Sequence, residues 1–382
     1  MERARAARCV GTGDHVPDRR ASRDAHGLSA LQRQAGNRAV AGRIAGVQRL
    51  GDEHGQHVGN GVVGLTASLS SPVPANALVR YEAEPLPVPG FTGFRFTVTD
   101  RSSGTVVRLL NSASPVVDLR LPGVARYRIT CAVTHGRTEL TRVSLDQDTR
   151  ARVRVSGSGG QDTAALDELA NELSQYVLDA ATATGPNGIT ARFLASVLRI
   201  EIGNTAPLPL MSPTAARDRE VARSQAAVRR REAGEDVPAG ELDASIGVGQ
   251  VKPSTAAMLL GDTPPIEQDR ANRAPGRDRI QRGFMALAPA RQRTLVTLLS
   301  WPKSNIAIAA QLLAGLKNRV HRYPGLPRAV FGASERAAQI IATEYNLGGS
   351  RTPEALANPS WYGREAWQHM GDPEMARLFP NT

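Results

Sequence analysis

The spacing of hydrophobic positions changes twice along this chain of 382 residues and divides it into three parts. Residues 1–58 carry few apolar side chains, residues 59–155 alternate apolar with polar positions, and residues 156–382 follow the helical period. The pattern predicts a multidomain α+β protein. We expect a disordered leader, a small β-sandwich and a mostly α-helical domain, in that order.

The leader, residues 1–58, is rich in Gly, Arg, Asp and His, which gives it too little apolar surface to fold alone. Residues 28–50 are the exception. Leu28 and Leu31, then Val40 and Ile44, are spaced like two short helical stripes on either side of a break at 36–37.

The second part predicts β-structure. Residues 94–99 alternate, residues 100–104 have turn chemistry, and residues 105–109 resume the alternation, which is typical of a hairpin. Further short strands are expected at 116–121, 125–133 and 139–145. Several strands at about this spacing favour a small sandwich of immunoglobulin-like type. We expect a binding or spacer domain, and its partner could be a carbohydrate, a larger particle or neither.

The third part predicts one mostly helical domain. Its first helix would be capped by Thr163 and would bury a stripe from Leu166 to Val177. Later helices are expected at 193–201, 254–260, 277–299, 303–319 and 334–345.

A carboxylate lies on the apolar face of the helix expected at 193–201. Phe193, Val197 and Glu201 are four residues apart, so all three side chains project from one face. Burial disfavours the charged form of a carboxylic acid and raises its pKa, and an acid still protonated near neutral pH can donate a proton to a leaving glycosidic oxygen. For Glu201 alone, a salt bridge with Arg199 would be the simpler alternative.

A turn at 245–256 supplies the candidate binding groups. Gly247 and Gly249 let the backbone bend sharply and approach a ligand, and the amide of Gln250 can donate and accept hydrogen bonds. A helix is expected to begin just behind Pro253.

These residues, in this order, resemble the lysozyme-like superfamily, most closely the soluble lytic transglycosylases and goose-type lysozymes. Residues 305–316 resemble the helix that follows an Asn-Ile pair in that family, and residues 345–348 resemble its Tyr-Asn-x-Gly motif. The resemblance implies that Glu201 is the catalytic acid, and lysozyme is a well-known case of an acid tuned by burial. It also implies that Gly247, Gly249, Gln250, Tyr345 and Asn346 bind peptidoglycan glycan strands at the β-1,4 bond between N-acetylmuramic acid and N-acetylglucosamine.

The chain departs from the family pattern at two places. Ile202 stands where family members usually have Ser, and a charged insertion runs from 215 to 235. The alternative is therefore an inactive lysozyme-like protein that binds the wall or assembles into a particle.

The mechanism depends on the number of carboxylates. Hydrolysis with inversion needs a second carboxylate to activate water, and Asp243 is preferred over Glu241 for that role. In a lytic transglycosylase one acid is enough, because the N-acetyl group of the substrate assists and an anhydro sugar forms. Both products stay open.

The leader carries a second resemblance. Residues 31–40 read Leu-Gln-Arg-Gln-Ala-Gly-Asn-Arg-Ala-Val and resemble a leader of bacterial proteins associated with extracellular contractile injection systems. The resemblance implies a cargo or an associated protein of a phage-tail-like particle, synthesised in the bacterial cytoplasm without a signal peptide and delivered to the envelope or outside. A basic tail with one amphipathic turn is the alternative. An effector aimed at another target also stays open.

The net charge and the composition limit the kinds of molecule that the protein is expected to bind. The net charge of +11 suits an anionic cell wall, a nucleic acid or an acidic membrane surface, and a GC-rich genome would produce the same excess of Arg. Since no basic run is interleaved with aromatics, we expect no nucleic-acid partner. No apolar stretch is long enough to predict a membrane span.

Other chemistry is weakly indicated. Two cysteines, Cys9 and Cys131, predict no disulfide framework, and the pair His54 and His57 lacks further metal ligands. We expect no metal and no cofactor. Aromatic residues at 361, 362 and 367 could line a sugar subsite, but core packing is the more common fate.

Overall fold

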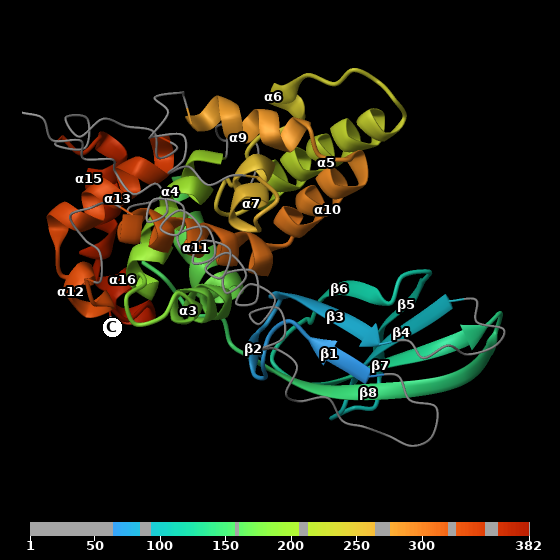
Figure 1. Ribbon diagram of the computed structural model, residues 1–382. Helices are drawn as coiled ribbons and strands as arrows, with labels where there is room; N and C mark the ends of the chain where they lie inside the picture. Colours follow the sequence, from blue (N-terminus) through green and yellow to red (C-terminus); the bar gives the residue numbers. More distant parts are fainter. Residues whose placement is uncertain are drawn as a thin grey trace, which may run out of the picture.

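The computed structural model describes residues 64–84, 93–156, 160–205, 213–263, 276–319, 326–347 and 358–381, which form a β-region followed by a helical region (Figure 1). The leader, with its motif at 28–50, Cys9 and the two leader histidines, lies outside the described residues. The mixed α and β content expected from the sequence is confirmed.

The described residues of the β-region form eight strands. They are β1 (Gly64–Ala67), β2 (Val73–Pro74), β3 (Leu78–Glu84), β4 (Gly93–Asp100), β5 (Val106–Ser112), β6 (Val116–Arg120), β7 (Arg126–His135) and β8 (Thr138–Arg150). One sheet has the order β1-β3-β6 and the other the order β2-β8-β7-β4-β5. The strands before residue 93 are not among those that the sequence pattern predicts.

Alternation explains how the two sheets share a core. Phe94, Phe96 and Val98 of β4 are buried at every second position, and Val79 and Tyr81 of β3 are buried in the same way from the other sheet. All five side chains belong to one hydrophobic cluster. The apolar residues that the pattern singles out therefore hold the two sheets together.

The hairpin predicted at 94–109 is confirmed, because β4 and β5 pair antiparallel. Asp100 organises its turn: the carboxylate accepts from the amide and the hydroxyl of Ser102, at 2.8 and 2.6 Å. Gly104 closes the turn with φ of +70°, a conformation that favours glycine.

The helical region follows. Its elements are α2 (Gly160–Glu168), a π-helical turn (Leu169–Leu173), α3 (Ser174–Ala183), α4 (Ala191–Thr205), α5 (Pro213–Glu232), α6 (Ala239–Leu242), α7 (Pro253–Leu259), α9 (Gly276–Met285), α10 (Pro289–Ser300), α11 (Pro302–Arg319), α12 (Arg328–Gly332), α13 (Glu335–Leu347), α15 (Trp361–Met370) and α16 (Pro373–Leu378).

Helix α4 lies at the centre of this region. Residues 193–200 are all buried, over more than two turns, so the helix is covered on every side rather than along one stripe. Its neighbours are α2, α3, α5, α15 and α16. Its buried polar side chains are hydrogen-bonded: the hydroxyl of Ser196 donates to the carbonyl of Arg192 at 2.8 Å, and Arg199 donates to Asp162 and Asp372.

Two predicted boundaries are wrong. Thr163 does not cap the first helix, which begins at Gly160 and continues through a π-helical turn into α3. The single helix expected at 277–299 is two helices, α9 and α10. Pro289 begins α10 and keeps Ala288 extended, with ψ of 141°, so no helix can run through this point.

The two regions are joined by specific contacts. The hydroxyls of Ser68 and Tyr176 lie 2.9 Å apart, and the guanidinium of Arg80 stacks 3.8 Å from the ring centroid of Trp301. Arg120 of β6 forms a 2.9 Å salt bridge with Glu172. In the part of the chain that the structure describes, no helix has the length and hydrophobicity needed to cross a bilayer.

Candidate functional site

Glu201 projects from α4 into a cavity of about 220 Å³. Burial raises the pKa of its carboxyl to about 7, and a 2.5 Å hydrogen bond donated by the hydroxyl of Tyr362 acts in the opposite direction. Glu201 lies on the same face as Phe193 and Val197, as its spacing predicts, but it is half-buried where they are fully buried. Near neutral pH such a group exists in both protonation states.

The cavity is shared by several of the predicted binding residues. It is lined by Glu201, Ser245, Gln250, Val251, Lys252, Ser254, Thr255, Ile280, Leu312, Leu316, Glu344, Tyr345 and Asn346. The structure thus brings together one acid, one amide and the Tyr-Asn pair from three separate parts of the chain. Gly247, Gly249 and Asp243 are not among the lining residues.

Asn305 of α11 holds the turn at 246–251 in place. The amide of Gly249 donates to the side-chain oxygen of Asn305 at 2.7 Å, and the Asn305 side-chain nitrogen donates to the carbonyls of Ile246 and Leu299 at 2.9 and 3.0 Å. Because both ends of this amide are occupied, the turn is fixed before any ligand binds.

Both glycines serve this close packing. Gly247 has φ of +78°, and a Cβ there would lie 2.3 Å from the Asn305 nitrogen. A Cβ on Gly249 would lie 2.9 Å from the Cβ of Ala309 and 3.2 Å from the hydroxyl of Tyr345. The expectation of a sharp bend is confirmed. The backbone approaches Asn305 and its neighbours, so these glycines support the site from behind.

Gln250 lies at the rim with φ of +46°. Its side-chain nitrogen donates to Glu220 at 2.9 Å and to the carbonyl of Gly247 at 3.1 Å. Glu220 belongs to α5, so the charged insertion seen in the sequence does lie beside the cavity. The carboxylate of Glu220 accepts this hydrogen bond, so the donor is already used in this structure.

Helix α13 supplies the opposite wall. The hydroxyl of Tyr345 donates to the carbonyl of Gly249, so the tyrosine ties α13 to the turn. Asn346 follows it at the exposed end of the helix, and Glu344 precedes it, fully buried. Burial raises the pKa of Tyr345, and the charge of nearby Glu201 adds to this effect.

The carboxylates proposed as bases have other contacts. Asp243 is buried, and it accepts hydrogen bonds from the amide and the hydroxyl of Ser254, at 2.7 and 2.8 Å, and from Gln281 at 3.3 Å. It thereby holds the first turn of α7. Burial raises the pKa of Asp243, while both donors of Ser254 act to lower it. Glu241 forms a surface pair with Arg230 at 2.9 Å.

The simpler alternative for Glu201, a salt bridge with Arg199, does not describe the arrangement. The buried guanidinium of Arg199 donates to Asp162 at 2.7 Å through both Nε and Nη2, and to Asp372 at 2.7 Å through Nη1. These contacts tie α4 to the beginning and to the end of the helical region.

Three residues near the cavity, Tyr362, Glu220 and Glu344, are not identified as site residues from the sequence. The pattern predicts Tyr362 as a core aromatic, and it is buried, but its hydroxyl also reaches Glu201. Glu220 stands out only as part of a charged segment. Glu344 has no role in the motifs, and its place directly before Tyr345 does not predict that it lines the same cavity, because neighbouring positions of a helix project in different directions.

Other chemistry finds little support in the described residues. They contain no group of three or more metal-ligating side chains. Cys131 is fully buried, and burial raises the pKa of its thiol to about 12, which makes it a poor nucleophile.

Comparison of the chain with models of known protein families, with curated protein sequences and with solved structures finds no match. The lysozyme-like assignment therefore stays a prediction that rests on the motifs quoted above and on the composition of this cavity.

Proposed function

We propose that this protein is a peptidoglycan-cleaving glycosidase that acts on the β-1,4 bond between N-acetylmuramic acid and N-acetylglucosamine. One observation carries the proposal: Glu201 is a half-buried acid whose pKa is raised to about 7, and it faces a cavity also lined by Gln250, Tyr345 and Asn346. A general acid works best when its pKa lies near the working pH. The order of these residues in the chain, quoted above, supports the choice of substrate.

In the proposed reaction Glu201 first serves as an acid. It transfers its proton to the glycosidic oxygen as the bond from that oxygen to the anomeric carbon breaks. The N-acetyl oxygen of the same sugar bonds to the anomeric carbon and stabilises the positive charge. The C6 hydroxyl then replaces it, and Glu201, now ionised, takes the proton of that hydroxyl. The products are a free 4-hydroxyl and a 1,6-anhydro end.

This route needs a single carboxylate, which favours the transglycosylase over an enzyme that uses Asp243 as base. Asp243 is held by Ser254 and Gln281 and does not line the cavity. Glu344 is the other carboxylate in the lining, and hydrolysis assisted by it would give a reducing end in place of the anhydro end.

The test is digestion of purified peptidoglycan followed by mass analysis of the soluble muropeptides. We expect anhydro ends from the wild-type protein. Glu201→Gln keeps the shape of the side chain without its acid, so release should fall by roughly 100- to 10,000-fold. Glu139→Gln, an exposed position on β8, is the matched control and should digest normally.

An absence of soluble products from every wall preparation, with a folded protein, would contradict the proposal. It would favour the alternative of a wall-binding protein without catalysis. The contact between Glu220 and Gln250 supports that alternative, because it occupies an amide that would otherwise be available to the glycan.

Two further assignments belong to the same proposal. The two-sheet region would be an immunoglobulin-like binding or spacer module, and the helices would form a lysozyme-like fold. Association with a contractile injection particle, and delivery by it, rests on the motif at residues 28–50.

A further inference from the structure

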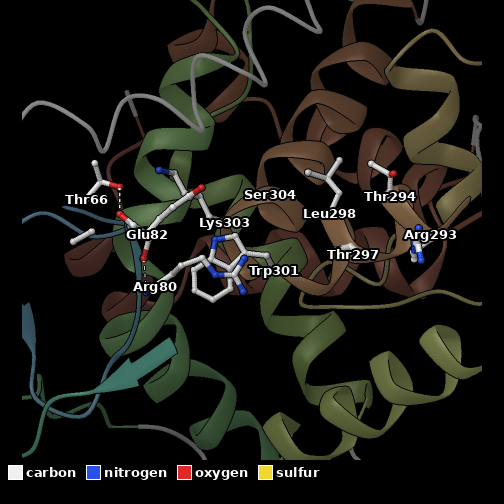
Figure 2. A pocket seen from close by; sticks show the side chains of 12 residues that line it. Thr66, Arg80, Glu82, Arg293, Thr294, Thr297, Leu298, Trp301, Lys303 and Ser304 are labelled. Carbon is white, nitrogen blue, oxygen red and sulfur yellow. Dashed lines mark hydrogen bonds between the residues drawn. The ribbon is translucent and has the colours of Figure 1, made fainter. Parts of the chain in front are cut away.

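A second cavity, of about 520 Å³, lies between the β-region and the helices. Figure 2 shows Thr66, Arg80 and Glu82 on one side, Arg293, Thr294, Thr297 and Leu298 on the other, and Trp301 between them. Its volume falls within the ~300–1,000 Å³ typical of small-molecule sites. Sites of this kind are common where two domains meet.

The walls of this cavity are fixed relative to each other. The guanidinium of Arg80 stacks on Trp301 from across the boundary, and Asp118 holds the same guanidinium with bonds of 2.9 and 3.0 Å. Ser68 and Tyr176 form a second link, at 2.9 Å. A site whose walls are already in place loses little free energy to ordering when a ligand binds.

The lining is rich in hydroxyl groups with remaining hydrogen-bonding capacity. The hydroxyls of Thr297 and Ser304 and the carboxylate of Glu82 have no hydrogen-bonding or ionic partner among the described residues. Thr294 donates to the carbonyl of Ala290 at 2.9 Å and can still accept. Leu298 and the edge of Trp301 add apolar surface beside these groups.

A lining that combines hydroxyl groups with apolar side chains matches a sugar ring, which carries hydroxyls on its rim and C–H groups on its faces. We propose that the cavity between the two regions is a second saccharide-binding site, for β-1,4-linked N-acetylated amino sugars. The choice of amino sugar rests on the proposed function. The site itself rests on the lining.

This site is separate from the cavity at Glu201, although α11 contributes to both. Ser304 lines the cavity between the regions and Leu312 lines the one at Glu201. Eight residues of helix place these two positions about 12 Å apart along the axis. A long glycan strand held at the second site would stay close to the protein while its other units reach Glu201.

Trp301 provides a local readout. The chain has three tryptophans, so replacing Trp361 and Trp367 by Phe leaves Trp301 as the only tryptophan, and excitation at the red edge of the absorption band avoids the tyrosines. In this background, with Glu201→Gln added to prevent cleavage, titration with chitotetraose should give a saturable change in emission. Ligand bound only at the Glu201 cavity would leave Trp301 unchanged, since Trp301 does not line it.

Thr297→Arg should weaken this response by roughly tenfold or more, because the longer side chain fills the cavity. Thr294→Arg should act in the same way. Both positions are exposed on α10, so neither change disturbs the core. Thr105→Arg adds the same charge at an exposed position outside the lining and should have no effect.

Absence of a saturable Trp301 response at tens of millimolar chitotetraose would overturn the second site, and so would a response that both cavity substitutions leave intact. The outcome is independent of the catalytic test. If the wild-type protein releases muropeptides and the emission of Trp301 does not change, only the proposal of a second site is refuted. If the emission of Trp301 changes but the wild-type protein releases no muropeptides, only the proposed reaction is refuted.

Discussion

Two acids of the helical region differ in their surroundings: the side chain of Asp243 is buried, and that of Glu201 is half-buried and faces a cavity. Burial raises the pKa of both. Asp243 accepts from two groups of Ser254 and from Gln281 and has no place in a cavity lining, whereas Glu201 faces a cavity and accepts from Tyr362. Burial alone therefore does not mark an acid as functional. The groups around it decide whether it holds the fold or faces a ligand.

The comparison implies that the ionisation of Glu201 destabilises the fold, and this is the largest effect on stability that we expect. Its pKa rises from 4.5 in the unfolded chain to about 7 in the folded protein. Below pH 4.5 both states are protonated. As pH rises toward 7 the unfolded state ionises first, so stability is lost, by about 3 kcal/mol in total.

Glu201→Gln removes this loss. Urea unfolding of the variant and of the wild type should give a difference in unfolding free energy that grows in favour of the variant by about 3 kcal/mol between pH 4 and pH 8. Glu139→Gln should show no such trend, because its side chain is exposed. A pH-independent difference at residue 201 would mean that the acid is not shielded from water.

Asp243→Ala should have the opposite and somewhat smaller effect. It leaves the buried amide and hydroxyl of Ser254 without their acceptor, which costs about 1–3 kcal/mol of unfolding free energy. Glu241→Ala, two residues earlier, breaks only an exposed ion pair and should change stability by less than about 1 kcal/mol. Digestion per folded molecule should persist in Asp243→Ala, and its loss would restore Asp243 as a catalytic candidate.

Tyr362→Phe should give the smallest effect, on the pH profile of digestion. As the acid, Glu201 must be protonated, so activity should fall as pH rises past 7. The hydrogen bond from Tyr362 favours the ionised form, so its removal should move this fall to higher pH. Tyr345→Phe should reduce activity without changing the pH at which activity decreases, because the hydroxyl of Tyr345 binds the carbonyl of Gly249. An unmoved profile in Tyr362→Phe would show that the phenol does not set the ionisation of Glu201.

Features encoded by neighbouring residues were predictable from the sequence. The β4–β5 hairpin follows from a local turn, the buried face of α4 follows from its period, and the bend at 247–250 follows from its glycines. The break between α9 and α10 is also visible in the sequence as Pro289. There the apolar period continues across the proline and favours one long helix, although proline cannot continue a helix from the preceding turn.

Contacts between distant residues were not predictable in this way. Tyr362 and Glu201 are 161 positions apart, and Glu220 and Gln250 are 30 apart. Such pairs depend on how whole helices pack, which no local pattern specifies. Asp243 lies close to the bend in sequence, and that proximity suggested a catalytic role. The structure places its carboxylate on the first turn of α7.

The tyrosine that contacts Glu201 comes from α15, one of the last helices of the chain. During synthesis the β-region and α4 leave the ribosome long before α15 does. Until that helix docks, Glu201 lacks the hydrogen bond from Tyr362 that favours its ionised form. The ionisation of Glu201 in the folded protein therefore depends on a helix that lies 161 positions away in the sequence.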